Sequence, residues 1–169
     1  MAFRHLLVPT DFSDPAHLAL KHAVEEAALH HAKVTLLHVL PAHTGTDVYY
    51  VSGTPTPGPE SGYEPLAGGR IGASMPEPTV VRRDRNEEAL TKLQDLVPDA
   101  SRGTWDVETA TGHPADVIVR IAEERDVDLI VMGTHGRTGL QHVLIGSVAE
   151  KVVRLAPCPV LTVRHRPEG

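Results

Sequence analysis

Short apolar runs typical of strands alternate with amphipathic runs typical of helices along most of this chain. The strand-like runs lie at residues 4–9, 34–39, 105–111, 127–132 and 160–163. The helix-like runs lie at residues 13–31, 89–97, 114–124 and 147–155. This alternation predicts one open sheet of parallel strands with helices on both faces, a doubly wound α/β fold. Because 169 residues supply enough material for one full core, we expect a single domain over residues 1–169.

A segment rich in proline and glycine interrupts the alternation at residues 41–78. It contains seven of the 14 prolines and seven of the 14 glycines of the chain. Such a composition is unable to sustain a helix or a central strand. A long irregular connection in a compact domain is usually a functional lid or a disordered excursion, and we expect a mobile loop here. Its tyrosines, Tyr49, Tyr50 and Tyr63, could cover a bound ligand or a partner surface.

Charge and hydropathy argue against several classes of protein. The formal net charge of -6 provides no general attraction to nucleic acid or to anionic lipid. No apolar run approaches the length of a membrane span, and the first residues lack the hydrophobic stretch of a secretory signal. We therefore expect a cytoplasmic protein that has neither nucleic acid nor a membrane as its partner.

Cysteine and histidine indicate no metal or disulfide chemistry. The single Cys158 is unable to form an internal disulfide, and we expect it to be a small buried hydrophobe, with a reactive thiol as the alternative. The 11 histidines do not fall into a recognised ligand spacing. We therefore expect no metal site built from protein side chains.

Glycines cluster directly after the strand-like run at residues 127–132. Gly133, Gly136 and Gly139 follow one another closely, and the pair Gly146 and Ser147 opens the next helix-like run. Glycine leaves the backbone N–H uncovered, so successive glycines let the main chain wrap around an anion. The start of a helix favours negative charge as well. The pattern therefore predicts a site for a phosphate chain.

Four side chains near these turns are candidate ligand contacts. His135 and Arg137 leave the glycine-rich loop, and an arginine offers fixed donors to phosphate oxygens; the alternative is that both are merely solvated. For Asp11, the alternative to ligand contact is capping of the first helix. Ser147 could likewise serve only as a helix N-cap.

The chain resembles the universal stress protein family. The spacing Gly133-x2-Gly136-x9-Gly146-Ser147 is similar to the nucleotide-binding signature of that family. The segments 6–13 and 157–163 resemble its first and last strands, whereas the segment 41–78 is longer than expected for it. The resemblance implies a five-stranded parallel sheet in the order 3-2-1-4-5, which binds ATP at the carboxyl ends of strands one and four. In such sheets ligands lie where neighbouring strands send their connections to opposite faces, which here is between Asp11 and Gly133.

The resemblance also implies which residues hold the nucleotide, with ATP, ADP or AMP as the ligand and Mg²⁺ held by its phosphates. The adenosine would lie against Pro9, Thr10, Asp11, Val39, Met132 and Gly133. The phosphates would lie against Gly136, Gly146, Ser147 and Val148, with His135 and Arg137 as the phosphate-side candidates already described.

Binding is favoured over catalysis by what the motif lacks. The chain has no Gly-x4-Gly-Lys-Ser/Thr sequence, so it lacks the lysine and the magnesium-binding hydroxyl of a P-loop. We expect a stress-response regulatory protein whose ATP occupancy modulates conformation or assembly. The alternatives are a slow ATPase and a partner-binding stress protein that does not use nucleotide.

The last strand-like run, residues 160–163, predicts an assembly. It would lie at a sheet edge, and pairing with its copy in a second subunit would cover the exposed backbone. The resemblance also implies such a homodimer. The alternative is an edge blocked by the charges of Arg164, His165 and Arg166.

Overall fold

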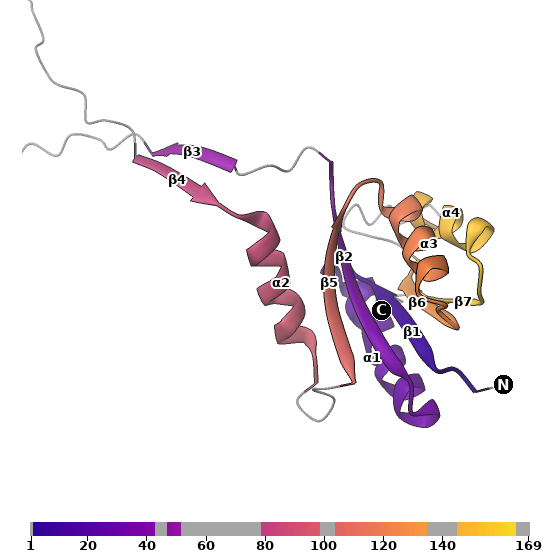
Figure 1. Cartoon of the computed structure of the whole chain (residues 1–169). Coiled ribbons are helices and arrows are strands. Elements are labelled where there is room, and N and C mark those ends of the chain that lie inside the picture. The colour runs from indigo at the N-terminus through magenta and orange to yellow at the C-terminus, as the bar shows by residue number, and fades with distance from the viewer. Residues whose placement is uncertain (1, 43–46, 52–78, 99–103, 135–144, 165–169) are drawn as a thin grey trace, which may run out of the picture. The chain divides into compact units, whose positions relative to one another are not determined.

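The computed structural model of the chain describes residues 2–42, 47–51, 79–98, 104–134 and 145–164 (Figure 1). Seven strands and four helices are described within these ranges: β1 (His5–Pro9), α1 (Asp14–His30), β2 (Lys33–Leu40), β3 (Asp47–Val51), β4 (Thr79–Arg83), α2 (Arg85–Leu96), β5 (Trp105–Thr111), α3 (Pro114–Glu124), β6 (Leu129–Gly133), α4 (Ser147–Leu155) and β7 (Val160–Val163). They form two compact units, one of residues 1–44 and 86–169 and the other of residues 45–85.

The larger unit contains a five-stranded sheet in the order β5-β2-β1-β6-β7. All four strand pairs are parallel. Counted along this sheet alone, the order is 3-2-1-4-5, so the predicted doubly wound α/β fold is confirmed. None of the described helices is long and apolar enough to cross a membrane.

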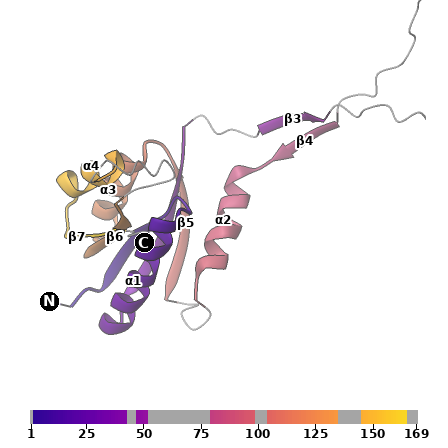
Figure 2. The ribbon, with the colours of Figure 1, turned by 180° about the vertical axis from the view of Figure 1, so that it is seen from behind.

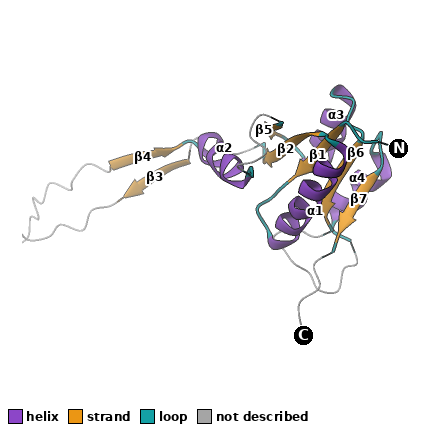
Figure 3. Cartoon of the chain, turned by 90° about the horizontal axis from the view of Figure 1, so that it is seen from below, coloured by secondary structure: helices purple, strands orange, loops and turns teal. Residues whose placement is uncertain are grey.

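Helices cover both faces of this sheet (Figures 2 and 3). Side chains of α1 and α2 pack with Leu6 and Val8 of β1 in one core cluster. Side chains of α3 and α4 pack with Leu7 of β1 in the other. Leu6, Leu7 and Val8 have no exposed surface, because a central parallel strand is buried on both faces. The apolar run that predicted the first strand therefore supplies both cores.

The smaller unit contains an antiparallel hairpin in which β3 pairs with β4. Figure 3 shows the two strands side by side. The strand β3 lies within the segment 41–78 that we expected to be a loop. Its five residues contain two valines and two tyrosines but neither proline nor glycine, which suits a strand. We did not predict this short strand because the proline and glycine content was considered for the whole segment. Residues 52–78 lie outside the described residues.

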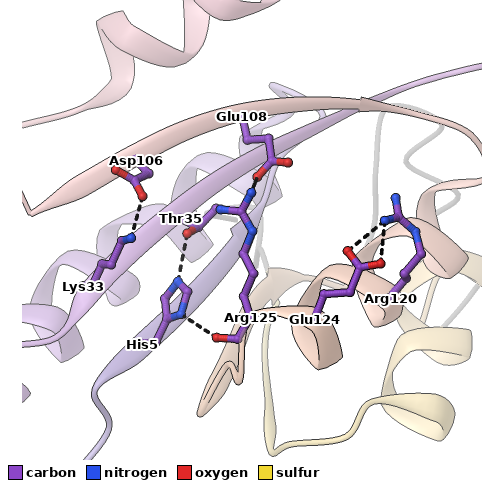
Figure 4. A network of polar contacts seen from close by, with 8 residues as sticks. All are labelled: His5, Lys33, Thr35, Asp106, Glu108, Arg120, Glu124 and Arg125. Carbon is purple, nitrogen blue, oxygen red and sulfur yellow. Dashed lines mark hydrogen bonds and ion pairs between the residues drawn. The ribbon is translucent and has the colours of Figure 1, made fainter.

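Polar contacts connect the amino ends of the strands in the larger unit (Figure 4). The His5 ring lies between the Thr35 hydroxyl, 2.9 Å from Nε2, and the Arg125 carbonyl oxygen, 3.2 Å from Nδ1. At the same end, main-chain N–H groups of Arg4 and His5 donate to Asp128 and lower the pKa of its carboxyl. These contacts stabilise the end of the sheet opposite to the one where ligands bind in such folds.

Candidate functional site

A cavity of about 250 Å³ lies at the carboxyl end of the sheet. It is lined by Pro9, Thr10, Asp11, Ala16, Leu37, Val39, Pro114, Ile118, Met132, Gly133, Thr134, Gly146, Ser147, Val148 and Ala149. Nine of the twelve predicted site residues are in this set. The other three, His135, Gly136 and Arg137, lie outside the described residues. The structure thus brings together predicted residues from four segments of the chain.

Sequence analysis missed six of the lining residues. They are Ala16, Leu37, Pro114, Ile118, Thr134 and Ala149. A signal existed for Leu37, because it lies two positions before Val39 and therefore on the same face of β2. Pro114 and Ile118 form part of the first turns of the helix that follows β5, at the same end of the sheet. Together with Met132, these side chains give the cavity an apolar part.

Thr134 joins the two turns that border the cavity. Its N–H group donates to the Val163 carbonyl oxygen at 2.9 Å, and its own carbonyl oxygen accepts from the Gly146 N–H at 2.7 Å. The end of β6 and the beginning of α4 are therefore held together, although ten residues of the chain separate Thr134 from Ile145. The hydrogen bond from Gly146 to Thr134 thus fixes where the start of α4 lies relative to the sheet.

The beginning of α4 presents backbone donors to the cavity. Gly146 is the N-cap residue, with φ -68° and ψ 155°, and the Glu150 N–H donates to its carbonyl oxygen at 2.9 Å. The N–H groups of Ser147, Val148 and Ala149 precede this first helical bond, so no helical carbonyl is in reach of them. Since glycine has no side chain to cap them, they can bind an anion, which the helix dipole also favours.

The alternative that Ser147 acts as the N-cap is wrong. The helix starts at Ser147 itself, and Gly146 occupies the cap position. Serine is among the preferred N-cap residues, which is why the sequence suggested that role. In the structure its hydroxyl is instead carried by an exposed first helical residue.

The turn between β1 and α1 forms another wall of the cavity. The Thr10 N–H donates to the Leu37 carbonyl oxygen at 2.8 Å, and the Thr10 hydroxyl oxygen accepts from the Phe12 N–H at 3.0 Å. Asp11 Oδ1 accepts from both the N–H and the hydroxyl of Ser13, at 3.1 and 2.5 Å. The carboxylate is therefore oriented by the residue that caps α1, and a carboxylate has about four acceptor positions in all.

Gly133 has a packing role in addition to lining the cavity. A Cβ atom on Gly133 would lie 2.9 Å from the carbonyl carbon of Pro15 and 3.0 Å from its oxygen. The first turn of α1 thus passes close to the end of β6, and only glycine fits there without a shift of backbone. This glycine belongs to the fold whether or not a ligand binds.

The described wall of the cavity carries little charge. Among the described lining residues, only Asp11 has a charged side chain. An ion pair of 2.6 Å between Lys151 and Asp116 joins α4 to α3, and the hydrogen bond from Lys151 lowers the pKa of Asp116. No group of three or more histidine, cysteine or acidic residues that could hold a metal ion exists among the described residues. The donors that this part of the chain offers to an anion are therefore backbone N–H groups and the hydroxyls of the lining serine and threonines.

Cys158 has the environment of a structural cysteine. It is partly buried against the core cluster of α3 and α4, and burial raises the pKa of its thiol. A reactive cysteine shows the opposite shift. The side chain is less buried than expected, but its pKa does not favour the alternative of a reactive thiol.

Comparisons with known proteins show the family of the chain. The sequence model of the universal stress protein family matches residues 2–164. The chain is 34% identical over 166 residues to the universal stress protein MJ0531 of Methanocaldococcus jannaschii, with 96% of this chain and 82% of that protein covered. It is 31% identical over 169 residues to MJ0577 of the same organism, with 97% and 96% covered.

Solved structures show the same fold. The structure of MJ0577 superposes with a TM-score of 0.67 at 26% identity and covers 99% of this chain and 100% of that one. The universal stress protein from Archaeoglobus fulgidus, solved in complex with dAMP, superposes with a TM-score of 0.56 at 23% identity and covers 96% and 99%.

Proposed function

This chain belongs to the universal stress protein family, and from that premise we propose that it is a cytoplasmic, ATP-binding regulatory protein of the stress response. Nucleotide occupancy of the cavity would modulate its conformation or assembly. The observation that carries the proposal is the start of α4, where three N–H groups border the cavity after an N-cap residue without a side chain. A family member of the same fold was solved with dAMP, which supports an adenine nucleotide as the ligand.

The proposed orientation puts the adenosine near β1 and β2 and the phosphates near α4. The apolar lining, with Val39 and Met132, suits the faces of a base and a ribose. The N–H groups of Ser147 and Val148 suit phosphate oxygens. Gly136, His135 and Arg137 remain proposed phosphate contacts, and Mg²⁺ would be held by the phosphates. ADP and AMP are the alternatives to ATP.

The second candidate function is slow ATP hydrolysis. Hydrolysis needs an oriented water and neutralisation of the developing charge. Asp11 is the only charged side chain among the described lining residues, and in our orientation it lies at the adenosine rather than at the phosphates. This position favours binding over turnover.

Binding of ATP should raise the melting temperature of the protein in proportion to ligand excess. At about 100 times the dissociation constant, the expected gain in free energy of unfolding is about 2.7 kcal/mol. GTP serves as the control for the base, and chromatography of the recovered nucleotide detects hydrolysis. An unchanged melting temperature at saturating ATP would instead favour a partner-binding protein that does not use nucleotide, and repeated phosphate release would favour the ATPase.

We also propose that the chain is a homodimer through the outer edge of β7, the last strand of the described five-stranded sheet. The carbonyl oxygen of Pro159 accepts from Ile130 of β6, and that of Val163 accepts from Thr134, which directly follows β6. The backbone polar groups of every second residue from 159 to 163 therefore face inward. Those of Val160 and Thr162 therefore face the edge, where they could pair with a second copy.

Replacement of Thr162 by proline should convert the dimer to a folded monomer. The substitution removes an N–H that faces the edge and leaves the bonds to β6 intact, as edge strands tolerate. Light scattering measures the mass, and Thr162→Val, which retains the N–H, is the matched control. A Thr162→Pro protein that stays dimeric would exclude this interface.

A further inference from the structure

His38 is buried behind the turn that carries Asp11. It lies on β2 next to Val39, and neighbouring side chains of a strand point to opposite faces of the sheet. Val39 therefore lines the cavity, while His38, a residue that is 8% exposed, packs on the other side. Its Nδ1 atom lies 2.7 Å from the Thr10 carbonyl oxygen. Because a carbonyl only accepts, Nδ1 carries the proton and donates this bond.

This bond fixes the orientation of the peptide that joins Thr10 to Asp11. A trans peptide is planar, so holding its carbonyl oxygen holds its whole plane. The next bonds in the turn run from Phe12 N–H to the Thr10 hydroxyl oxygen and from Ser13 to Asp11. The direction of the Asp11 carboxylate therefore depends on a peptide that His38 holds from outside the cavity.

Phe12 shows that this turn needs support. Its φ of 64° is in the left-handed region, which costs free energy for a bulky residue and persists only where the surroundings enforce it. The Phe12 ring packs on the His38 ring with centroids 4.6 Å apart. The Nζ atom of Lys92 on α2, which is paired with Glu88, lies over the Phe12 ring at 5.9 Å from its centroid. His38 thus contacts both the strained residue Phe12 and the peptide that joins Thr10 to Asp11.

We propose that His38 is a positioning residue of the nucleotide site, an inference that rests on the proposed function. It touches no ligand. Its Nδ1–H holds the Thr10–Ser13 turn in the conformation that receives the adenosine. The effect is confined to the adenosine end of the site, because the bonds that place the start of α4 involve Thr134 and Gly146.

The test compares two variants of His38 by calorimetric titration with ATP and with AMP. His38→Leu retains apolar volume and removes the donor, whereas an asparagine side-chain NH₂ can occupy the position of Nδ1. We expect His38→Leu to weaken the binding of ATP and the binding of AMP by the same factor of about ten, which corresponds to the loss of one good hydrogen bond. His38→Asn should bind both nucleotides within about twofold of wild type.

Thr35→Val is the matched structural control. Thr35 is on the same strand and fully buried, but its hydroxyl bonds His5 at the opposite end of the sheet. This variant should lose thermal stability without a change in ATP affinity. If wild type binds ATP and His38→Leu binds it equally tightly, or if asparagine fails to rescue, the positioning role is overturned. If wild type binds neither nucleotide, the proposed function itself fails, and the inference fails with it.

Discussion

Replacement of Gly146 by aspartate should abolish ATP binding and leave the fold intact. The φ and ψ of Gly146, -68° and 155°, are open to any residue, and aspartate is a preferred N-cap. Its carboxylate would accept from the N–H of Val148 or Ala149 and would put a negative charge where the phosphates are proposed to lie. Each charge-assisted bond that is lost costs about 1.5–3 kcal/mol, and charge repulsion adds to this cost. We therefore expect ATP to bind at least about 100-fold more weakly, which corresponds to about 2.7 kcal/mol of binding free energy.

Gly146→Asn tests whether the loss of ATP binding comes from the negative charge of aspartate or from the capped N–H groups alone. Asparagine caps the helix with nearly the same shape but is neutral, so we expect an intermediate loss of affinity of about tenfold. The unliganded melting temperature of both variants should equal or exceed that of wild type, because a cap is gained. Calorimetric titration with ATP measures the affinities. An aspartate variant that binds ATP within about threefold of wild type would show that phosphate does not lie at this helix.

Replacement of Gly133 by alanine should destabilise the protein even without ligand. The new Cβ would meet the Pro15 carbonyl group at 2.9 to 3.0 Å, so backbone must move. Overpacking of this kind costs about 1–3 kcal/mol, and for a chain of this size each kcal/mol lowers the melting temperature by about 2–4 °C. Thermal unfolding of the unliganded protein measures the effect.

A second substitution tests whether the Pro15 backbone causes this loss. The nearest atoms of Pro15 are its carbonyl carbon, its Cβ and its carbonyl oxygen, and alanine retains all three. Pro15→Ala in the Gly133→Ala protein should therefore not restore stability. A Gly133→Ala protein as stable as wild type would contradict the packing role and leave ligand binding as the reason for this glycine.

The sheet could be predicted because its signal is local. Leu6, Leu7 and Val8 are consecutive and fully buried, and such a run has few other uses than a central strand. The observed bounds of β5 and β7 are those expected from the sequence. The hairpin strand β3 was missed because its five residues lie beside a much longer stretch of proline and glycine.

The site could be predicted only in part, because residue type does not show what a residue is used for. Gly133 and Gly146 look alike in the motif, yet the first packs against α1 and the second opens α4. His38 gave no signal, since its partner is a carbonyl oxygen 28 positions away in the sequence. The roles of the two glycines and of His38 follow from contacts between residues that are far apart in the sequence.

The most direct test of our central claim is a titration of isotope-labelled protein with ATP, followed through its backbone amide signals. Our account predicts that the amides of Ser147 and Val148 shift and saturate together with those of Thr10 and Asp11. The amides of Lys33 and Arg125, at the opposite end of the sheet, should stay unchanged. Saturation by ATP without any shift at Ser147 and Val148 would contradict the account.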